Sequence, residues 1–194
     1  MPRVLVVATI PALAYRSCPS IHGSDVNEVV GTRTGAVGGE RAAAGVAIFA
    51  VALAVRLAHV WQMRGSPFFT VLMGDSRSYD EWARRIAGGE WIGREVFYQA
   101  PLYPYFLGVL YAIAGHHLLL VRIVQAILGS MACVFLATAG ERFFSPRVGL
   151  LAGLILALYA PAIFFDGLIQ KSTLDVFFVC LALWLMARIA TVRL

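Results

Sequence analysis

Charged residues are scarce in this sequence. They make up 14% of its 194 residues, while apolar residues make up 60%. Soluble domains carry about 25% charged and 45–50% apolar residues, so this chain lacks the polar surface that a soluble domain of its length needs. Its apolar residues stand in long runs, which is typical of helices that cross a lipid bilayer. The composition therefore predicts an all-α polytopic transmembrane bundle.

Lysine and cysteine are also rare. Lys171 is the only lysine beside fifteen arginines, and the formal net charge is +5. The arginines lie at the ends of apolar runs, as in membrane proteins whose basic residues orient the helices, and this placement argues against nucleic acid as a partner. The three cysteines are far apart and two of them stand inside apolar runs, so they predict neither a disulfide framework nor a metal site.

Residues 1–41 contain no convincing membrane span. Residues 2–16 are apolar but too short to cross a bilayer. Three interpretations stay open for them: a signal peptide, a tail or a wrongly assigned start. Residues 17–41 are rich in Gly, Ser, Thr and charge without periodicity, which predicts a flexible linker.

Four later apolar runs predict membrane spans, at residues 42–61, 118–140, 148–165 and 173–190. The third span opens with Gly149 and Gly153, a GxxxG pattern that allows close approach of another helix. Arg56 and Arg122 lie within or at the edge of spans. A charge in such a place either has a partner or extends toward the interface, and the sequence leaves both open.

The predicted loop 62–117 contains two further helices. Residues 76–87 have apolar residues at i, i+3, i+4 and i+7, which predicts a helix that lies on the membrane surface or packs on the protein. Residues 101–115 are apolar but short, so we expect an interfacial or re-entrant helix. The face of the first helix consists of Tyr79, Trp82, Ala83 and Ile86.

The arginines also predict the orientation. If residues 101–115 do not cross, four crossings place every basic loop on the cytoplasmic side. The loop 62–117 and the turn 166–172 then share the external face. The polar residues expected there are Asp75, Gln99, His116, His117, Asp166 and Lys171, with Arg122 just below.

Asp75 has two compatible interpretations. It follows Gly74 and opens the amphipathic helix, where Asp is a preferred N-cap residue. At the water interface its carboxylate is also suited to remove a proton from an acceptor hydroxyl. A helix N-terminus would keep that carboxylate ionised.

Asp166 and Lys171 bracket the second external turn. They form either a solvated loop with an ion pair or part of a binding site. A lysine at a helix start opposes the helix dipole. A bound phosphate would remove this conflict and would use the free N–H groups there.

Two segments resemble a known family. The segments are Gly74-Asp75-Ser76-Arg77-Ser78-Tyr79 and Phe97-Tyr98-Gln99-Ala100-Pro101-Leu102-Tyr103-Pro104. They resemble the first external loop of membrane glycosyltransferases of the C-type superfamily, family 39, similar to protein O-mannosyltransferases and aminoarabinose transferases. Val121-Arg122 and Phe165-Asp166 with Lys171-Ser172 continue the pattern, so the resemblance covers roughly residues 45–190.

The resemblance implies an enzyme of the bacterial inner membrane, with its active face outward. It would transfer a hexose or pentose, with inversion, from a polyprenyl-phosphate donor to a protein, lipid or glycan acceptor of the cell envelope. Asp75 matches the catalytic base of the family. The resemblance assigns substrate contacts to Tyr79, Gln99, Arg122, Asp166 and Lys171.

The chain departs from the family in two respects. Gln99 stands just before the proline where some relatives have an acidic metal ligand, so a divalent metal is an open question. Family members continue for several more spans. We therefore expect residues 42–194 to be the N-terminal part of a glycosyltransferase domain, a fragment that need not be active alone.

Two other function classes fit a membrane bundle. A transporter or channel fragment would use Arg56, Arg122, Asp166 and Asp175 as a polar path through the bundle. A structural membrane subunit would have scattered external acids. The enzyme instead predicts polar residues that converge at one interface.

Overall fold

The computed structural model describes the backbone of residues 23–92 and 99–192 and the side chains of residues 39–67, 69–92 and 99–190. The chain divides into two units, residues 1–39 and 40–194. Helix α1 (Gly23–Met63) runs through the boundary between them. The first unit contributes only the beginning of α1 to the described residues, and everything that follows concerns the second.

The linker predicted at 17–41 is wrong for residues 23–41, because α1 already begins at Gly23. Extending an existing helix by one residue costs much less free energy than starting a new one. The apolar run from Ala42 onward supplies the nucleus, so weak helix formers before it can be helical too. Residues 1–22, including the apolar stretch 2–16, lie outside the described residues.

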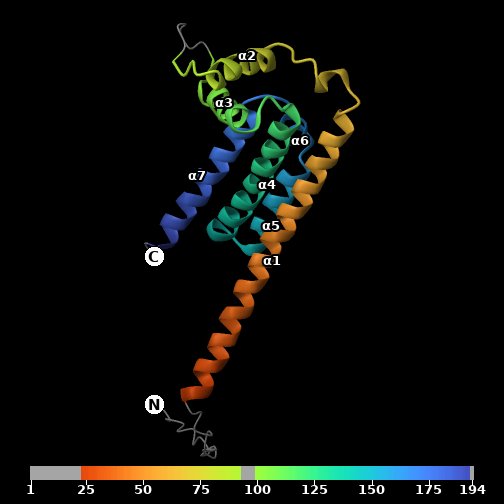
Figure 1. Cartoon of the computed structure of the whole chain (residues 1–194). Helices are drawn as coiled ribbons and strands as arrows, with labels where there is room; N and C mark the ends of the chain where they lie inside the picture. Colours follow the sequence, from red (N-terminus) through yellow and green to blue (C-terminus); the bar gives the residue numbers. More distant parts are fainter. Residues whose placement is uncertain (1–22, 93–98, 193–194) are drawn as a thin grey trace, which may run out of the picture. The chain divides into compact units, whose positions relative to one another are not determined.

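Three helices are long and apolar enough to cross a membrane. They are the α1 segment Gly39–Met63, α4 (Leu118–Phe143) and the Ser172–Ala190 part of α7 (Ser172–Val192). They match three of the four predicted spans. In the described part of the chain every regular element is a helix, which confirms the all-α bundle (Figure 1).

The third predicted span is not one straight helix. It consists of α5 (Pro146–Leu158) and α6 (Ala160–Asp166), which are bent by 54° at Tyr159. Pro161 has no N–H group, so it cannot bond the carbonyl of Ala157 four residues earlier. Arg56 Nη1 donates to that carbonyl oxygen instead, at 3.3 Å. The proline breaks the helix, and a buried arginine uses the acceptor that the break releases.

Helix α4 packs between α5 and α7 in the bundle (Figure 1). The predicted GxxxG pattern lies at the contact of α4 with α5. A Cβ at Gly153 would come within 2.7 Å of Ala137 Cβ, and one at Gly149 would overlap the Ala137 carbonyl oxygen. These glycines therefore allow the close helix approach that the sequence predicted.

Two short helices, α2 (Asp75–Ala87) and α3 (Leu102–Ala114), pack on each other at one end of the bundle (Figure 1). The predicted face of α2 is inside: Tyr79, Ala83 and Ile86 are buried, and Trp82 is half-buried. Helix α3 has 13 residues. At 1.5 Å per residue it is about 20 Å long, too short for the hydrocarbon core of about 30 Å.

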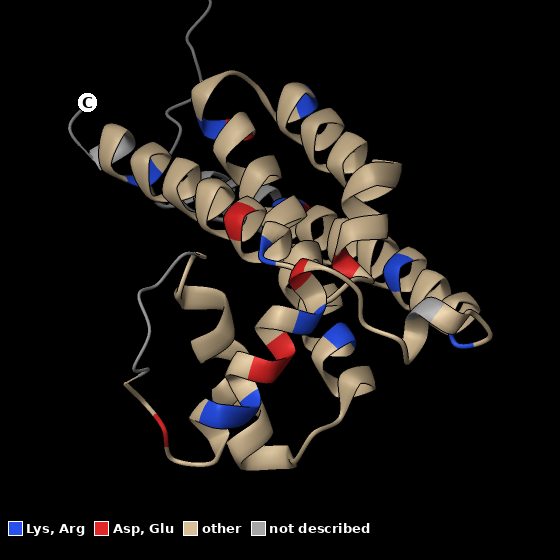
Figure 2. Cartoon of the chain, turned by 90° about the horizontal axis from the view of Figure 1, so that it is seen from above, with Lys and Arg blue, Asp and Glu red and all other residues tan. Residues whose placement is uncertain are grey.

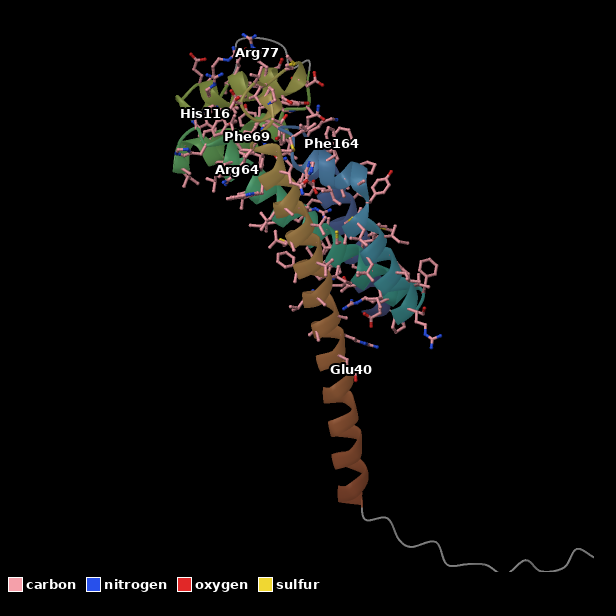
Figure 3. All side chains as sticks on the ribbon, turned by 90° about the vertical axis from the view of Figure 1, so that its right-hand side faces the viewer. Glu40, Arg64, Phe69, Arg77, His116 and Phe164 are labelled. Carbon is pink, nitrogen blue, oxygen red and sulfur yellow. The ribbon has the colours of Figure 1, made fainter. Side chains whose placement is uncertain are left out.

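Several basic residues lie at the other end of the bundle. Arg41 Nε lies 2.8 Å from Glu141 Oε1, which joins the start of the first span to the end of α4. Arg142 and Arg147 are close by in the chain. Figure 3 shows Arg77 and His116 at one end of the bundle. Glu40, at the start of the first span, lies far from them. The bundle thus separates the α2–α3 pair from the basic loop ends.

Candidate active site

Asp75 lies at the first position of α2, in an exposed position. The N-cap interpretation is wrong, because Gly74 occupies the N-cap with φ of 57° and no side chain caps the helix. Glycine suits this left-handed backbone conformation. Asp75 Oδ1 instead accepts a hydrogen bond of 3.0 Å from Gln99 Nε2. Two residues that the sequence singled out, 24 positions apart, therefore meet.

The α2–α3 packing holds this pair in place. Tyr79 is buried, and its ring meets the ring of Tyr103 edge-on at 5.1 Å. A Cβ at Gly108 would come within 2.7 Å of Ile86 Cγ2, so glycine allows α3 to approach α2 closely. Tyr79 thus supports the helix that carries Asp75, and its buried ring is not open to a substrate.

Asp80 is a second buried carboxylate on α2, and sequence reasoning missed it. Its Oδ1 accepts a 2.7 Å hydrogen bond from Tyr111 OH and lies 2.7 Å from His116 Nε2. Arg84 Nη2 lies 2.9 Å from Oδ2. Burial, together with the hydrogen bond to Asp80, raises the pKa of Tyr111 above its usual value. The i, i+4 spacing of Asp80 and Arg84 was the only available signal in the sequence.

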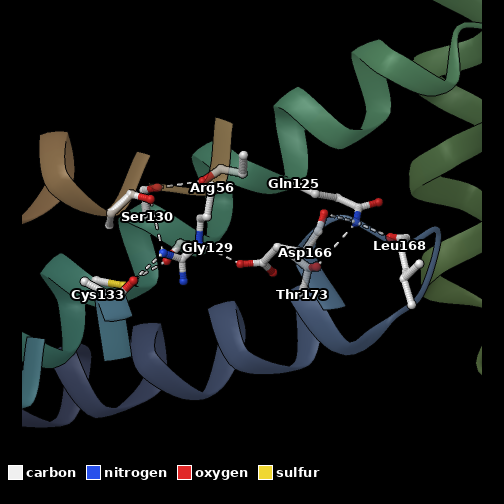
Figure 4. A network of polar contacts seen from close by, with 11 residues as sticks. Arg56, Gln125, Gly129, Ser130, Cys133, Asp166, Leu168 and Thr173 are labelled. Atoms are coloured by element: carbon white, nitrogen blue, oxygen red, sulfur yellow. Dashed lines mark hydrogen bonds and ion pairs between the residues drawn. The ribbon is translucent and has the colours of Figure 1, made fainter. Parts of the chain in front are cut away.

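Asp166 lies inside the bundle and not on the external face where we expected it. Arg56 Nε donates to Asp166 Oδ2 at 2.7 Å, and both side chains are buried (Figure 4). Gly129 of α4 faces the pair, and a Cβ there would overlap the carboxylate and come within 2.8 Å of Arg56 Nε. Because a buried charge needs a partner, this pair explains why a charged residue stands within each of two spans.

Gln125 forms hydrogen bonds with several segments at once, and sequence reasoning missed it. Its Oε1 accepts from Tyr103 OH at 2.7 Å, and its Nε2 donates to the carbonyl oxygens of Asp166 at 3.1 Å and Leu168 at 2.6 Å (Figure 4). The amide is fully buried. It therefore ties α3 to the turn between α6 and α7. A polar amide within the predicted span 118–140 was the signal in the sequence.

Arg122 is also fully buried, so it does not extend to the interface. Its Nε donates to the Gly167 carbonyl oxygen at 2.8 Å and its Nη2 to that of Phe69 at 2.9 Å. The guanidinium lies 4.0 Å from the Phe69 ring centroid. Arg122 thus joins α4, the end of α6 and the short 3₁₀ helix η1 (Pro67–Phe69).

Lys171 forms an ion pair with a residue one helical turn later. Its Nζ lies 3.7 Å from Asp175 Oδ2, one turn into α7, and both side chains are exposed. Asp175 in the first turn offsets the conflict between the lysine and the helix dipole without a bound phosphate. Lys171 remains an exposed cation at the α6–α7 turn.

The structure therefore separates the predicted site residues into three groups. Asp75 and Gln99 are accessible and bonded to each other, whereas Tyr79, Arg122 and Asp166 are buried supports, and Lys171 pairs with Asp175. Of the four residues expected on a transport path, three are buried and bonded to other segments, namely Arg56, Arg122 and Asp166. The fourth, Asp175, is exposed in the first turn of α7. The described residues include no cluster of three or more His, Cys, Asp or Glu side chains suited to a metal ion.

The comparisons with known proteins concern the second half of the chain. Residues 98–193 match the profile of the family described as dolichyl-phosphate-mannose-protein mannosyltransferase. The matched range contains Gln99 and helices α3 to α7, while Asp75 and Tyr79 precede it. No curated protein and no solved structure matches. The predicted resemblance to family 39 is thereby confirmed for residues 98–193, which are similar to the dolichyl-phosphate-mannose-protein mannosyltransferase family.

Proposed function

We propose that this protein transfers a sugar from a polyprenyl-phosphate donor to an acceptor hydroxyl at the outer face of a bacterial inner membrane. The observation that carries the proposal is the match of residues 98–193 to a family whose name specifies dolichyl phosphate mannose as the donor. The structure adds an accessible carboxylate beside that segment. The acceptor class, whether protein, lipid or glycan, stays open in this proposal.

Asp75 is the proposed general base. Asp80 and Asp166 are buried next to basic side chains, whereas Asp75 is exposed and its hydrogen-bond partner is the neutral amide of Gln99. A neutral amide orients a carboxylate and leaves its charge available. A positioned carboxylate of this kind contributes about 10²- to 10⁴-fold to a proton-transfer step.

The proposed reaction is a single displacement. As Asp75 takes the proton of the acceptor hydroxyl, the acceptor oxygen forms a bond to the anomeric carbon. The bond from that carbon to the phosphate oxygen breaks, and its electron pair leaves with the lipid phosphate. Attack opposite to the leaving group inverts the anomeric configuration. Lys171, an exposed cation, would neutralise the departing phosphate.

A divalent metal has no complete ligand set among the described residues. The Asp75 carboxylate and the Gln99 amide oxygen would offer two oxygen ligands, which is fewer than Mg²⁺ or Ca²⁺ takes. No step of the proposed reaction is therefore routed through a metal. Waters or other protein groups would have to complete such a site.

The test uses membranes of cells that express the full-length gene product, with radiolabelled dolichyl-phosphate mannose as the donor. We expect label to move to membrane protein, lipid or glycan, and the anomeric configuration of the product to be opposite to that of the donor. Retention of configuration would contradict the single displacement. Absence of transfer from this donor and from undecaprenyl-phosphate sugars would contradict the proposed function.

A further inference from the structure

We propose that Gln125 is a positioning residue, which sets the distance between the Asp75 carboxylate and the Lys171 ammonium group. Its amide is fully buried, so it acts through other residues and not on a substrate. The inference rests on the proposed function, in which Asp75 takes the acceptor proton while Lys171 neutralises the departing phosphate. A single displacement needs both groups in place at the same moment, so their separation enters the rate.

Helix α3 connects Asp75 to Gln125. The charged groups of the α2–α3 pair all belong to α2, which carries six, so α3 supplies neutral contacts (Figure 2). Gln99, just before α3, donates to Asp75 Oδ1 at 3.0 Å. The Tyr103 ring meets the Tyr79 ring of α2 at 5.1 Å, and Tyr103 OH donates to Gln125 Oε1 at 2.7 Å. A displacement of Tyr103 therefore moves the helix pair that carries the proposed base.

The turn between α6 and α7 connects Gln125 to Lys171. Gln125 Nε2 donates to the carbonyl oxygens of Asp166 at 3.1 Å and Leu168 at 2.6 Å (Figure 4). It also donates to Thr173 Oγ1 at 3.4 Å. These acceptors stand on both sides of Lys171 in the chain. The same amide thus holds the segment on which the exposed cation lies.

An amide suits this connection because its hydrogen bonds have direction. Its oxygen accepts from α3 while its NH₂ group donates to the turn. The buried apolar cluster that includes Tyr103 and Ile169 joins the same two segments, but apolar contact has no preferred direction. Gln125 therefore fixes a geometry that packing leaves adjustable. A misplacement of about 1 Å can lower an enzymatic rate about 100-fold.

The test is a double-mutant cycle in the full-length protein, with dolichyl-phosphate mannose as the donor. Tyr103→Phe removes the hydroxyl that bonds Gln125 and leaves the bonds from the amide to the turn in place. Lys171→Met removes the cation. Thr138→Val is the control, because the Thr138 hydroxyl bonds carbonyl oxygens of its own helix and joins no two segments. The measured quantities are kcat and KM for each single variant and for the double variant.

We expect Tyr103→Phe to lower kcat about 10- to 100-fold at a nearly unchanged KM. Once Lys171 is replaced by methionine, the same change should lower kcat less than about threefold, because no cation is left to be positioned. Thr138→Val should transfer at close to the wild-type rate in both backgrounds. An equal loss from Tyr103→Phe in both backgrounds would overturn the proposal, since Gln125 would then only stabilise the bundle.

A second measurement needs no activity. Spin labels at Arg77→Cys, near Asp75, and at Lys171→Cys report the distance between the two exposed positions, in a background where the three native cysteines are alanine. We expect Gln125→Leu to shift or broaden the distance distribution and Thr138→Val to leave it unchanged. An unchanged distribution in Gln125→Leu would overturn this proposal alone. Absence of transfer by the unaltered protein would instead contradict the proposed function.

Discussion

At the scale of single residues, the buried charges explain why polar residues stand in apolar helices. Arg56 and Asp166 belong to different spans and pair at 2.7 Å. Removing one partner of a buried ion pair leaves an uncompensated charge, at a cost of about 3–5 kcal/mol. The pair also depends on a residue without a side chain, Gly129, which makes room for the carboxylate.

We predict that Gly129→Ala destabilises the bundle. The new Cβ would overlap the Asp166 carboxylate, and overpacking of this kind costs about 1–3 kcal/mol. The measurement is thermal unfolding in detergent. Gly45→Ala is the control, because a Cβ there meets only Val134 Cγ1 at 3.7 Å, an ordinary contact. Equal melting temperatures for the two variants would contradict the packing of the ion pair against Gly129.

The buried tyrosines of α3 predict a loss of stability in alkali. Burial raises the pKa of Tyr103 and of Tyr111 above their usual values, and the hydrogen bond to Asp80 adds to the effect at Tyr111. Their contribution to stability is therefore complete below the unfolded pKa of about 10. It is lost as the pH rises from there toward the folded pKa.

The check is a melting temperature that falls above about pH 10 and falls less steeply in Tyr111→Phe. Tyr159→Phe is the control, because Tyr159 is exposed. The prediction is contradicted if the wild-type melting temperature is the same below and above this pH. In that case the two hydroxyls would ionise as readily in the folded protein as in the unfolded chain.

At the scale of elements, Gln125 couples the α2–α3 pair to the rest of the bundle. It bonds α3 through Tyr103 OH and the α6–α7 turn through two carbonyl oxygens. Arg122 adds a second tie from α4 to the same turn through Gly167. The candidate base is thus held by a short helix pair whose position depends on these buried polar bonds and on apolar packing against Val121, Ile169 and Leu174.

We predict that Gln125→Leu loosens α2 and α3 more than Tyr103→Phe does. The leucine leaves the Tyr103 hydroxyl and the Asp166 carbonyl unsatisfied, at about 1–3 kcal/mol each, while the Leu168 carbonyl still accepts from Gln170 N. The phenylalanine leaves only the Gln125 oxygen unsatisfied. Hydrogen exchange of residues 75–87 and 102–114 measures the effect. The prediction fails if both variants exchange at the wild-type rate.

At the scale of the whole molecule, the bundle places the basic helix ends and the candidate site at opposite ends. If the short loop with Arg142 and Arg147 stays in the cytoplasm, the α2–α3 end faces outward even though α2 carries arginines of its own. Labelling with a membrane-impermeant thiol reagent in intact cells tests this. We predict that Arg85→Cys is labelled and that Phe144→Cys is labelled only after the membrane is opened. The opposite pattern would invert the topology. Both side chains are exposed, so access to the thiol does not depend on unfolding.

Much of the fold could be predicted from the sequence, because membrane spans and amphipathic faces are local patterns. Three spans, the apolar face of α2 and the contact at Gly149 and Gly153 were predicted correctly. The structure packs that face on the protein, which was one of the two placements left open. The break at Tyr159 was not predicted, although the sequence has a proline two residues later, Pro161. A proline inside a helix removes a hydrogen bond and crowds the preceding turn. The sequence did not show that Arg56, on a distant helix, bonds the carbonyl that this break releases.

The candidate site was less predictable, because its contacts join residues far apart in the sequence. Asp75 and Gln99 were chosen through a resemblance and then found together. Asp80 and Gln125 gave little local signal, since their partners Tyr111 and Leu168 lie 31 and 43 residues away. Asp166 was expected at the surface because the sequence gave no reason to pair it with Arg56, which is 110 residues earlier.

The central claim is that Asp75 is the base of a sugar transfer, and one comparison tests it most directly. Full-length protein with Asp75→Asn is measured against Glu81→Gln, both of which replace an exposed carboxylate of α2 by its amide. With dolichyl-phosphate mannose as the donor, we predict that Asp75→Asn lowers the transfer rate about 100-fold or more at an unchanged melting temperature. Glu81→Gln should transfer at close to the wild-type rate. Transfer by Asp75→Asn at the wild-type rate would contradict the claim.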